Sequence, residues 1–437
     1  MTLMLRLCLL FAVLALPARA AVPIEEVVSP GGIRAWLVEE RAIPFVALEI
    51  RVRGGTSLDA PGKRGAVNLM AALIEEGAGD LDAQGFAAAR DALAADLRFR
   101  AGGDSLAVSA RMLTENRDQV VALLRQALLA PRFDPEAIER VRGQVLANIR
   151  SDAKDPEALA NRHFDAAAFG DHPYGSSGDG TLDSVAALTR DDILAAHQGA
   201  LARDRMYVAA VGDISAQELG LLLDDLLGAL PATGAPLPGP ADFALAGGVS
   251  VVDYPSPQSV ILFGHKGITR TDPDFFAAFV MNEILGGQRF TGRLMTELRE
   301  KRGLTYGVGT YLADMDHAQM VIGQMSTDNA TAAQAVDQIR AEWARMAESG
   351  VTEAELAAAQ TYLTGAYPLR FDGNGTIAGI LVGMQMQGWP IDYPDTRNDR
   401  INAVTVADVA RVAARMLQPG DLHFVVVGQP EGLASAP

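Results

Sequence analysis

The chain has 437 residues, of which 49% are hydrophobic, and its formal net charge is −17 at neutral pH. Such an acidic chain repels phosphate backbones, so nucleic acid is a poor candidate partner. Cys8 is the only cysteine, which argues against a disulfide framework, an iron–sulfur cluster and a cysteine nucleophile. The length is sufficient for two or more hydrophobic cores.

Residues 1–20, MTLMLRLCLLFAVLALPARA, have the features of a secretory signal peptide. An early arginine precedes a short apolar stretch, and small residues stand before the expected cleavage after Ala20. The apolar stretch is too short to span a bilayer stably, so an uncleaved anchor is the weaker alternative. Cleavage would remove Cys8, Arg6 and Arg19 and change the net charge to −19. We therefore expect a periplasmic protein with no stable membrane span.

The mature chain contains one series of elements twice, on the two sides of a segment rich in proline, glycine and alanine. We interpret this segment, residues 231–248, as a linker between domains 21–230 and 249–437. Each series ends with a threonine-capped helix and a β-strand that stops at glycine. The caps Thr189 and Thr405 are 216 residues apart. The strand-ending glycines have the same offset, which favours duplication over chance similarity.

Strands and helices are expected in the same order in both halves: one strand, two helices, a strand pair and two longer amphipathic helices. In the first half the strands are 45–55, 96–103 and 105–113 and the longer helices 116–130 and 133–152; in the second half the strands are 259–267, 304–312 and 318–326 and the helices 330–350 and 351–367. Consecutive strand pairs with helices between them favour an α+β fold with antiparallel sheets and helices on one face. Two such domains facing each other would form a cleft.

No familiar catalytic motif is present in the sequence. The six histidines are scattered, and no two are four residues apart, so no helix can present the pair of imidazoles that holds zinc on one face. The chain has no GxSxG nucleophile elbow. The segment GNGTIAG at residues 373–379 lacks the lysine of a phosphate loop and is interpreted as a helix start or loop.

One dense polar segment in the second half is a candidate site: GGQRFTGRLMTELREKRGLTYGVGTYL, residues 286–312. Arg299 near the end of the expected helix and Tyr306 on the expected following strand could converge on one point. Both could donate hydrogen bonds to a peptide carbonyl or a developing oxyanion. The alternative is that Arg299 pairs with a nearby acid such as Glu300 and that Tyr306 packs.

Three segments resemble the pitrilysin/insulinase family of zinc peptidases, the inverted-motif zincins that include the mitochondrial processing peptidase. These are GGTSLDAPGKRG (54–65), FGDHPYG (169–175) and LREKRGLTYGVGTYL (298–312), and the likeness covers nearly all of the mature chain. The resemblance implies two homologous α+β domains that enclose a peptide chamber.

The same resemblance implies that the zinc site has been lost. In active members the helix after GKRG carries HxxEH, and a later helix supplies a glutamate as the third ligand. On this chain those positions fall on Asn68, Ala71 and Ala72, and near Ala147. Alanine has no donor atom and asparagine is a poor zinc ligand, so metal and general base are lost together. We expect no metal in this chain and zinc in a partner subunit.

In two-subunit members of the family, one chain keeps the zinc helix while the other supplies an Arg–Tyr pair that matches Arg299 and Tyr306. The resemblance therefore implies a non-catalytic, substrate-binding subunit that pairs with a homologous zinc peptidase chain. The glycine-rich loop of the mitochondrial non-catalytic subunit is shortened here to LGGQRF, so presequence recognition is not expected. Two alternatives stay open: a stand-alone periplasmic peptide-binding or scaffold protein, and a peptidase with an unrelated catalytic site.

Overall fold

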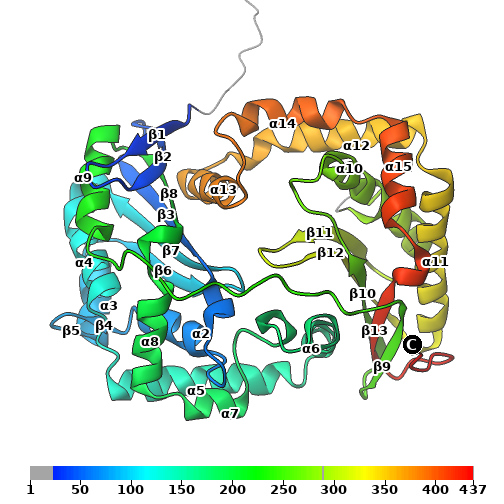
Figure 1. Cartoon of the computed structure of the whole chain (residues 1–437), viewed down its shortest axis with the longest axis horizontal. Helices are drawn as coiled ribbons and strands as arrows, with labels where there is room; N and C mark the ends of the chain where they lie inside the picture. Colours follow the sequence, from blue (N-terminus) through cyan, green and yellow to red (C-terminus); the bar gives the residue numbers. More distant parts are fainter. Residues whose placement is uncertain (1–22, 288–289, 437) are drawn as a thin grey trace, which may run out of the picture.

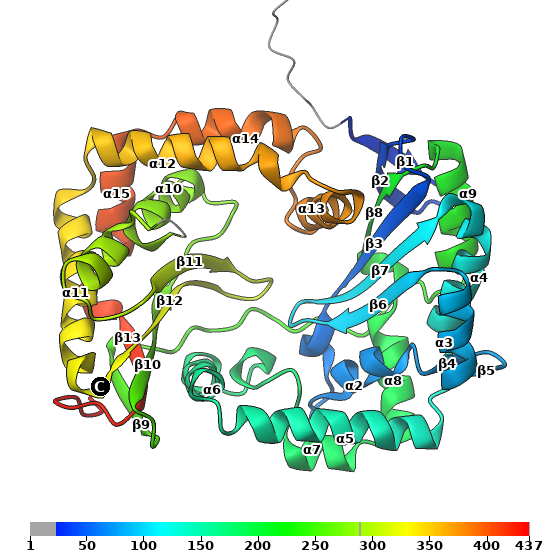
Figure 2. The ribbon, with the colours of Figure 1, turned by 180° about the vertical axis from the view of Figure 1, so that it is seen from behind.

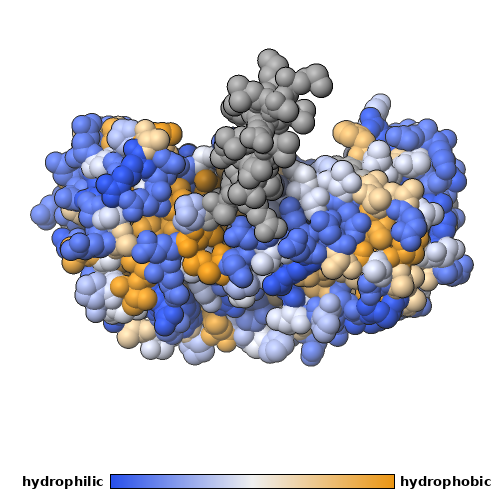
Figure 3. Space-filling view, turned by 90° about the horizontal axis from the view of Figure 1, so that it is seen from above, coloured by the Kyte–Doolittle hydropathy of each residue, from blue (hydrophilic) through white to orange (hydrophobic). Residues whose placement is uncertain are grey.

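Two β-sheets face each other across the molecule, and most helices cover their outer faces (Figures 1 and 2). The structure is a computed structural model that describes residues 23–287 and 290–436. The predicted signal peptide, with Cys8, lies outside these residues. Within them, no helix is both long and apolar enough to cross a membrane. Figure 3 shows that the face seen from above is mostly hydrophilic, with apolar residues in several patches.

The two sheets have the same strand order. The first contains β1 (Glu25–Val28), β2 (Arg34–Glu39), β3 (Phe45–Arg53), β6 (Asp96–Ala101), β7 (Ser105–Leu113) and β8 (Met206–Gly212). The second contains β9 (Gly248–Asp253), β10 (Gln258–Lys266), β11 (Val308–Asp314), β12 (Gln319–Asp328) and β13 (His423–Gly428). The orders are β1-β2-β8-β3-β7-β6 and β9-β13-β10-β12-β11. Apart from the extra β1 they match strand for strand, as a duplicated chain should.

Both sheets are mixed, so the expectation of purely antiparallel sheets is wrong for one strand pair in each. β2 pairs in parallel with β8, and β9 pairs in parallel with β13. The other pairs are antiparallel, including the predicted hairpins β6-β7 and β11-β12. In each half, the parallel pair joins a strand near the start of the half to the strand that ends the half. Short turns reveal neighbouring partners, whereas such distant partners leave no local signal.

The helices also follow one another in matching order. In the first half they are α2 (Ala66–Leu73), α3 (Ala83–Ala92), α4 (Arg117–Leu129), α5 (Pro135–Asp152), α6 (Pro156–Phe169), α7 (Leu182–Ala187), α8 (Arg190–Ala200) and α9 (Ala216–Leu227), with a two-residue hairpin of β4 (Gly77–Ala78) and β5 (Leu81–Asp82). In the second half they are α10 (Phe275–Gly286), a π-helical turn (Met295–Glu300), α11 (Ala332–Ser349), α12 (Glu353–Ala366), α13 (Asn374–Met386), α14 (Tyr393–Asn402) and α15 (Val406–Met416). GNGTIAG begins α13, as expected for a helix start.

The predicted helix caps are confirmed. The Thr189 hydroxyl accepts a hydrogen bond from the Asp192 amide at 3.2 Å, and the Asp192 carboxylate accepts one from the Thr189 amide at 2.8 Å. Thr405 and Asp408 repeat this capping box at the start of α15. Because each box satisfies amides that the first helical turn leaves free, α8 and α15 begin at equivalent residues.

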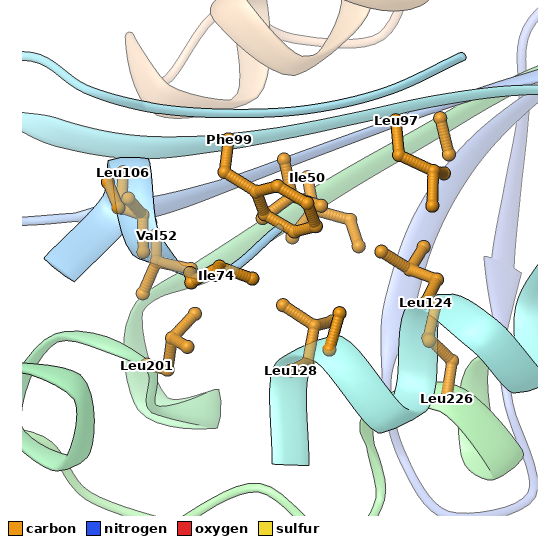
Figure 4. Close-up of a cluster of buried hydrophobic side chains, with 14 of the residues drawn as sticks. Ile50, Val52, Ile74, Leu97, Phe99, Leu106, Leu124, Leu128, Leu201 and Leu226 are labelled. Atoms are coloured by element: carbon orange, nitrogen blue, oxygen red, sulfur yellow. The ribbon is translucent and has the colours of Figure 1, made fainter. Parts of the chain in front are cut away.

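Each sheet buries one face against its own helices. Figure 4 shows part of the first core, in which Ile50 of β3 and Phe99 of β6 lie above leucines of α4, and Leu106 of β7 lies beside Val52. These strands alternate buried and exposed side chains, as in residues 105–113, where every second residue is buried. The second core is equivalent and surrounds the fully buried Trp343 of α11.

One helix from each half packs on the sheet of the other half. α6 lies on β10 and β13, and α13 lies on β3 and β8. The α6 contact buries Phe164 completely among residues of the second sheet, including Leu262 and Val425. The α13 contact buries Leu381 against the first sheet, next to Ala47. The two helices occupy equivalent places in the two series, so the exchange joins the halves reciprocally.

The predicted linker crosses between the halves without forming a helix or strand over residues 231–247. It is nevertheless packed. The Ala241 amide donates to the His317 carbonyl at 2.8 Å, and the Ala244 amide donates to the Ala168 carbonyl at 2.8 Å. Phe243 lies edge-on to Phe169, with ring centroids 5.9 Å apart. The proposed domain boundaries on either side of this segment stay a prediction.

Candidate functional site

The helix that corresponds to the zinc helix, α2, begins at a turn held by one buried carboxylate. Asp59 accepts hydrogen bonds from the Gly65 and Val67 amides, both at 2.8 Å, and forms an ion pair with Arg64 at 3.2 Å. Burial raises the pKa of Asp59, while these amides oppose the rise. Gly65 has a left-handed φ of 94°, which glycine adopts readily. The hydrogen bonds within the segment DAPGKRG thus fix the residue at which α2 begins.

The four positions implied as a former zinc site hold no set of metal ligands. The Asn68 side-chain amide donates to the Asp179 carboxylate at 2.9 Å. Ala71 is 2% exposed and packs in the core, Ala72 is half-buried and Ala147 is exposed on α5. In the part of the chain that the structure describes, no group of three or more His, Cys, Asp or Glu side chains is placed to hold a metal ion. The residues present therefore do not fit zinc.

The two acids that follow α2 are engaged elsewhere. Glu75 forms an ion pair with Arg90 at 3.2 Å, and Glu76 accepts a hydrogen bond from Arg140 at 3.0 Å. Both arginines lie away from Asn68 in the sequence, on α3 and α5. These pairs agree with the sequence-based interpretation that the two glutamates do not replace a lost ligand.

A cavity of 510 Å³ opens beside the start of α2. Asp104, Asp165, Asp179 and Arg64 line it from the first half, and Met315 lines it from the second. Burial raises the pKa of Asp165 to about 6. The cavity wall is therefore rich in carboxyl groups whose charge is poorly solvated.

The segment FGDHPYG joins the two halves at this cavity. The Tyr174 hydroxyl donates to Asp104 and accepts a hydrogen bond from the His317 amide at 3.2 Å. Asp104 also accepts a hydrogen bond from the Asp316 amide at 3.1 Å. Burial, followed by the hydrogen bond with Asp104, raises the pKa of Tyr174. The motif is visible in the sequence, but Asp104 could not be recognised as its partner because the two lie far apart in the chain.

Arg299 lies near the end of a π-helical turn, in which the Lys301 amide donates to the Thr296 carbonyl five residues earlier at 3.0 Å. Such turns are frequent at functional sites. The Arg299 guanidinium lies 5.0 Å from the centroid of the Phe290 ring. Within the described residues it forms no ion pair with Glu300. The alternative of a simple Arg299–Glu300 pair is therefore not what the structure shows.

The neighbouring acid of this turn, Glu297, is already neutralised by other cations. It pairs with Lys301 and with Arg302, both at 2.7 Å. The hydrogen bond from Lys301 and then that from Arg302 lower its pKa against the effect of burial. The ion pairs of Glu297 are thus made with Lys301, Arg302 and Arg345, and not with the exposed Arg299.

Tyr306 lies in a bend before β11, and not on the strand where the sequence placed it. The Thr305 hydroxyl donates to the Gly307 carbonyl at 2.8 Å and accepts from the Gly307 amide at 3.1 Å. This local hydrogen bonding competes with strand pairing and turns the Tyr306 side chain outward. Tyr306 is 90% exposed, so the alternative that it packs in the core is wrong.

A second cavity, of 830 Å³, opens beside this bend. Tyr306, Phe290 and Tyr311 line it from the second half, and Glu157 of α6 lines it from the first. All three aromatic side chains are exposed, Phe290 to 65% and Tyr311 to 55%. Exposed aromatic residues gathered at a cavity mark interaction sites. Arg299 adjoins the cavity through its contact with Phe290.

Comparisons with known proteins identify the family. Residues 35–181 match the family profile described as Insulinase (Peptidase family M16), and residues 187–363 match that described as Peptidase M16 inactive domain. The chain belongs to the M16 insulinase family. This confirms the resemblance found in the sequence.

Relatives within the M16 family carry different descriptions. The chain is 24% identical over 390 residues to the non-peptidase homolog YmxG of Helicobacter pylori, covering 89% of this chain and 90% of that protein. It is 25% identical to an uncharacterized zinc protease of Streptomyces coelicolor, over 89% of this chain and 86% of that protein. It is also 26% identical to a probable mitochondrial-processing peptidase subunit beta of Schizosaccharomyces pombe, over 72% and 71% of the two chains.

Solved structures agree on the fold. A peptidase M16 inactive domain from Pseudomonas fluorescens superposes with a TM-score of 0.87 at 27% identity, covering 95% of this chain and all of that one. A protease from Helicobacter pylori superposes with a TM-score of 0.84 at 17% identity, covering 92% and 99%. The relatives thus include both peptidases and a non-peptidase, and the site residues of this chain must decide between them.

Proposed function

We propose that this M16 protein is the non-catalytic, substrate-binding subunit of an exported heteromeric zinc metallopeptidase. The observation that carries the proposal is a contrast within one chain. α2 offers no zinc ligands at the family positions, while Arg299 and Tyr306 are exposed beside a cavity large enough for several peptide residues. The similarity to a non-peptidase homologue and to a processing-peptidase subunit supports the same reading.

The two residues have complementary roles in this proposal. The Arg299 guanidinium and the Tyr306 hydroxyl are hydrogen-bond donors that suit the carbonyl of a bound peptide and the oxyanion that forms when it is attacked. Hydrolysis itself depends on a homologous partner chain that carries the HxxEH helix. This chain binds and orients the peptide at the partner's active site.

A peptide chamber between the two halves is part of the proposal. The sheets face each other in Figure 1, and the cavities beside Asp179 and beside Tyr306 each have lining residues from both halves. Glu157 and Met315 are the residues that cross over. Both cavities would open into the chamber, where an extended peptide would contact both sheets.

The first test is purification of the tagged chain from its native periplasm, followed by mass spectrometry of what accompanies it. We expect a homologous chain with an HxxEH helix. The pair should cleave peptides and contain zinc, whereas the isolated chain should do neither. N-terminal sequencing of the exported chain should begin at Ala21 if the predicted signal peptide is cleaved.

Two results would contradict the proposal. Stoichiometric zinc and chelator-sensitive cleavage by the isolated chain would show a peptidase with its own, unrelated site. Peptide binding without any homologous companion would instead support the stand-alone peptide-binding or scaffold alternative.

A further inference from the structure

A third cavity, of 550 Å³, lies in the second half between the start of α10 and the helices α13 and α14. None of its lining residues lines the cavity beside Tyr306. It adjoins the exchanged helix α13, and the lining residues Met384 and Tyr393 also pack in the cluster that joins α13 to the first sheet. The cavity is therefore separate from the site proposed above and lies next to the contact between the halves.

Six aromatic residues contribute to its wall. They are Phe275, Phe276, Phe279, Tyr367, Trp389 and Tyr393. Trp389 and Tyr393 are stacked, with centroids 4.4 Å apart and planes at 14°. The rings of Phe275 and Phe276 lie 6.0 and 5.9 Å from that of Trp389. This aromatic part of the wall is apolar, and it suits the body of an aromatic or branched aliphatic ligand.

Guanidinium groups supply the polar part of the cavity. Arg397 is only 6% exposed and lies 4.2 Å from the centroid of Tyr367. It donates to the Leu363 carbonyl at 3.1 Å and to the Asn398 side chain at 3.2 Å, and it also has a side-chain hydrogen bond with Tyr393. No Asp or Glu of the described residues forms an ion pair with it. Arg370 is exposed and lines the same cavity.

The charge of Arg397 faces no carboxylate among the residues that line the cavity. None of the residues that line the cavity is Asp or Glu. A third cation of the wall, Arg270, is neutralised by Asp314 at 2.9 Å, which leaves Arg397 as the buried exception. Buried charges in proteins are normally paired, because a charge removed from water without a counter-ion is costly. An entering anion would supply that missing partner.

Two glycines keep one side of the cavity open. Gly379 and Gly383 lie one turn apart on α13, and a Cβ at either position would meet no atom within 4 Å. Their φ values are ordinary, so the backbone does not require glycine. Gly375 on the same helix differs, since a Cβ there would lie 2.6 Å from Arg111. Glycine inside a helix costs stability relative to alanine, and here packing does not explain that cost.

We propose that this cavity binds an apolar carboxylate: a free carboxyl group on an aromatic or branched aliphatic body, as at the C-terminus of a peptide that ends in an apolar residue. The carboxylate would pair with Arg397 in the cavity and Arg370 near its mouth. The apolar body would lie between the aromatic wall and the open backbone at Gly379 and Gly383. This proposal does not depend on a partner subunit.

The direct test is calorimetric titration of the full chain with three probes: N-acetylated alanyl-alanyl-phenylalanine, the same peptide with a C-terminal amide, and 3-phenylpropionate. We expect the peptide acid to bind at least about tenfold more tightly than the amide, because only the acid forms charged hydrogen bonds with the arginines. Equal binding of 3-phenylpropionate would support the site and identify a small apolar acid as the source. Equal binding of acid and amide, or no binding of either acid, would overturn the proposal.

Variants distinguish a ligand-binding role of these residues from a role in packing alone. Gly379→Ala with Gly383→Ala should raise the melting temperature and weaken binding of the peptide acid about tenfold or more, because the new methyl groups enter the ligand space. Gly143→Ala is the matched control: Gly143 lies inside α5 with no atom near its Cβ position, so it should raise the melting temperature and leave binding unchanged. Arg370→Gln, at an exposed position, should weaken the acid and leave the amide unchanged. Wild-type affinity in the glycine and Arg370 variants would contradict the site.

Discussion

The two halves of the chain share one scaffold and differ in the regions that follow their central strands. In the first half, Asp59 holds the start of α2 and Asn68 is bonded to Asp179, beside a cavity lined by carboxyl groups. In the second half, α10 ends beside an open cavity with the exposed Phe290 and Tyr306. The strand order and the caps are the same in both. The scaffold therefore says little about activity, and function must be argued from the residues at helix ends and bends.

The exchanged helices repeat this difference. α6 fills its contact with the second sheet by large apolar side chains such as Phe164 and Phe169. α13 instead presents Gly379 and Gly383 to a cavity beside its contact with the first sheet. Equivalent helices in a duplicated chain thus differ beside their contacts, with large apolar side chains on α6 and open glycines on α13.

The largest expected effect on stability is at the packed contact between α6 and the second sheet. Phe164→Ala should lower the free energy of unfolding by about 3–5 kcal/mol, because it removes a fully buried ring and leaves a cavity at the contact between the halves. Urea denaturation measures this loss. Leu221→Ala on α9, where the side chain is 59% exposed, is the control and should change stability by less than about 0.5 kcal/mol. A comparably small change for Phe164→Ala would show that α6 does not join the halves.

An intermediate effect is expected at Asp165, also on α6. Burial raises the pKa of Asp165 from 3.8 to about 6, so the folded protein holds this proton more tightly than the unfolded chain. Stability should then fall as the pH rises from about 4 to about 6. Asp165→Asn should abolish this fall and make the protein more stable by roughly 1–3 kcal/mol at pH 7.5, with little change at pH 3.5.

Denaturation curves at the two pH values measure the Asp165 effect. Asp171→Asn, at an exposed position just beyond α6, is the matched control and should shift stability little at either pH. A stabilisation by Asp165→Asn that is the same at both pH values would argue against a buried carboxyl group as its cause.

The smallest expected effect on stability tests whether the two halves use equivalent helix caps. Thr189→Ala and Thr405→Ala each remove the same capping box, from α8 and α15, and each should cost about 1 kcal/mol. Thr361→Ala, on an exposed face of α12 where the hydroxyl bonds to the Ala357 carbonyl, should cost little or nothing. Markedly unequal losses at the two caps would show that the two halves do not use these boxes in the same way.

Much of the fold could be predicted because helix caps and strand patterns depend on residues that are close in the sequence. The caps at Thr189 and Thr405 and the alternation in strands such as residues 105–113 depend on neighbours in sequence, and the structure confirms them. The parallel pairs could not be predicted, because β2 and β8 are joined only through the rest of the half. The exchange of α6 and α13 depends on contacts between the halves, which periodicity does not record.

The candidate site was predicted only in outline. The sequence singled out Arg299 and Tyr306, yet the bend that exposes Tyr306 depends on hydrogen bonds between Thr305 and Gly307. Arg299 lies within a π-helical turn and contacts Phe290, which precedes that turn, and the sequence pattern did not predict the π-helical geometry. Arg397 was missed entirely, because a charged residue gives no sequence signal that it is buried.

The measurement that tests the account most directly is peptide cleavage by the reconstituted pair with variants of this chain alone. Arg299→Ala and Tyr306→Phe should each lower kcat/KM by about 100-fold, since each removes a donor to the developing oxyanion. Two residues on outer helices provide controls, the half-buried Arg125→Ala on α4 and the exposed Tyr362→Phe on α12, and should leave cleavage unchanged. Wild-type kcat/KM in both the Arg299 and the Tyr306 variants would contradict the claim that this chain completes its partner's active site.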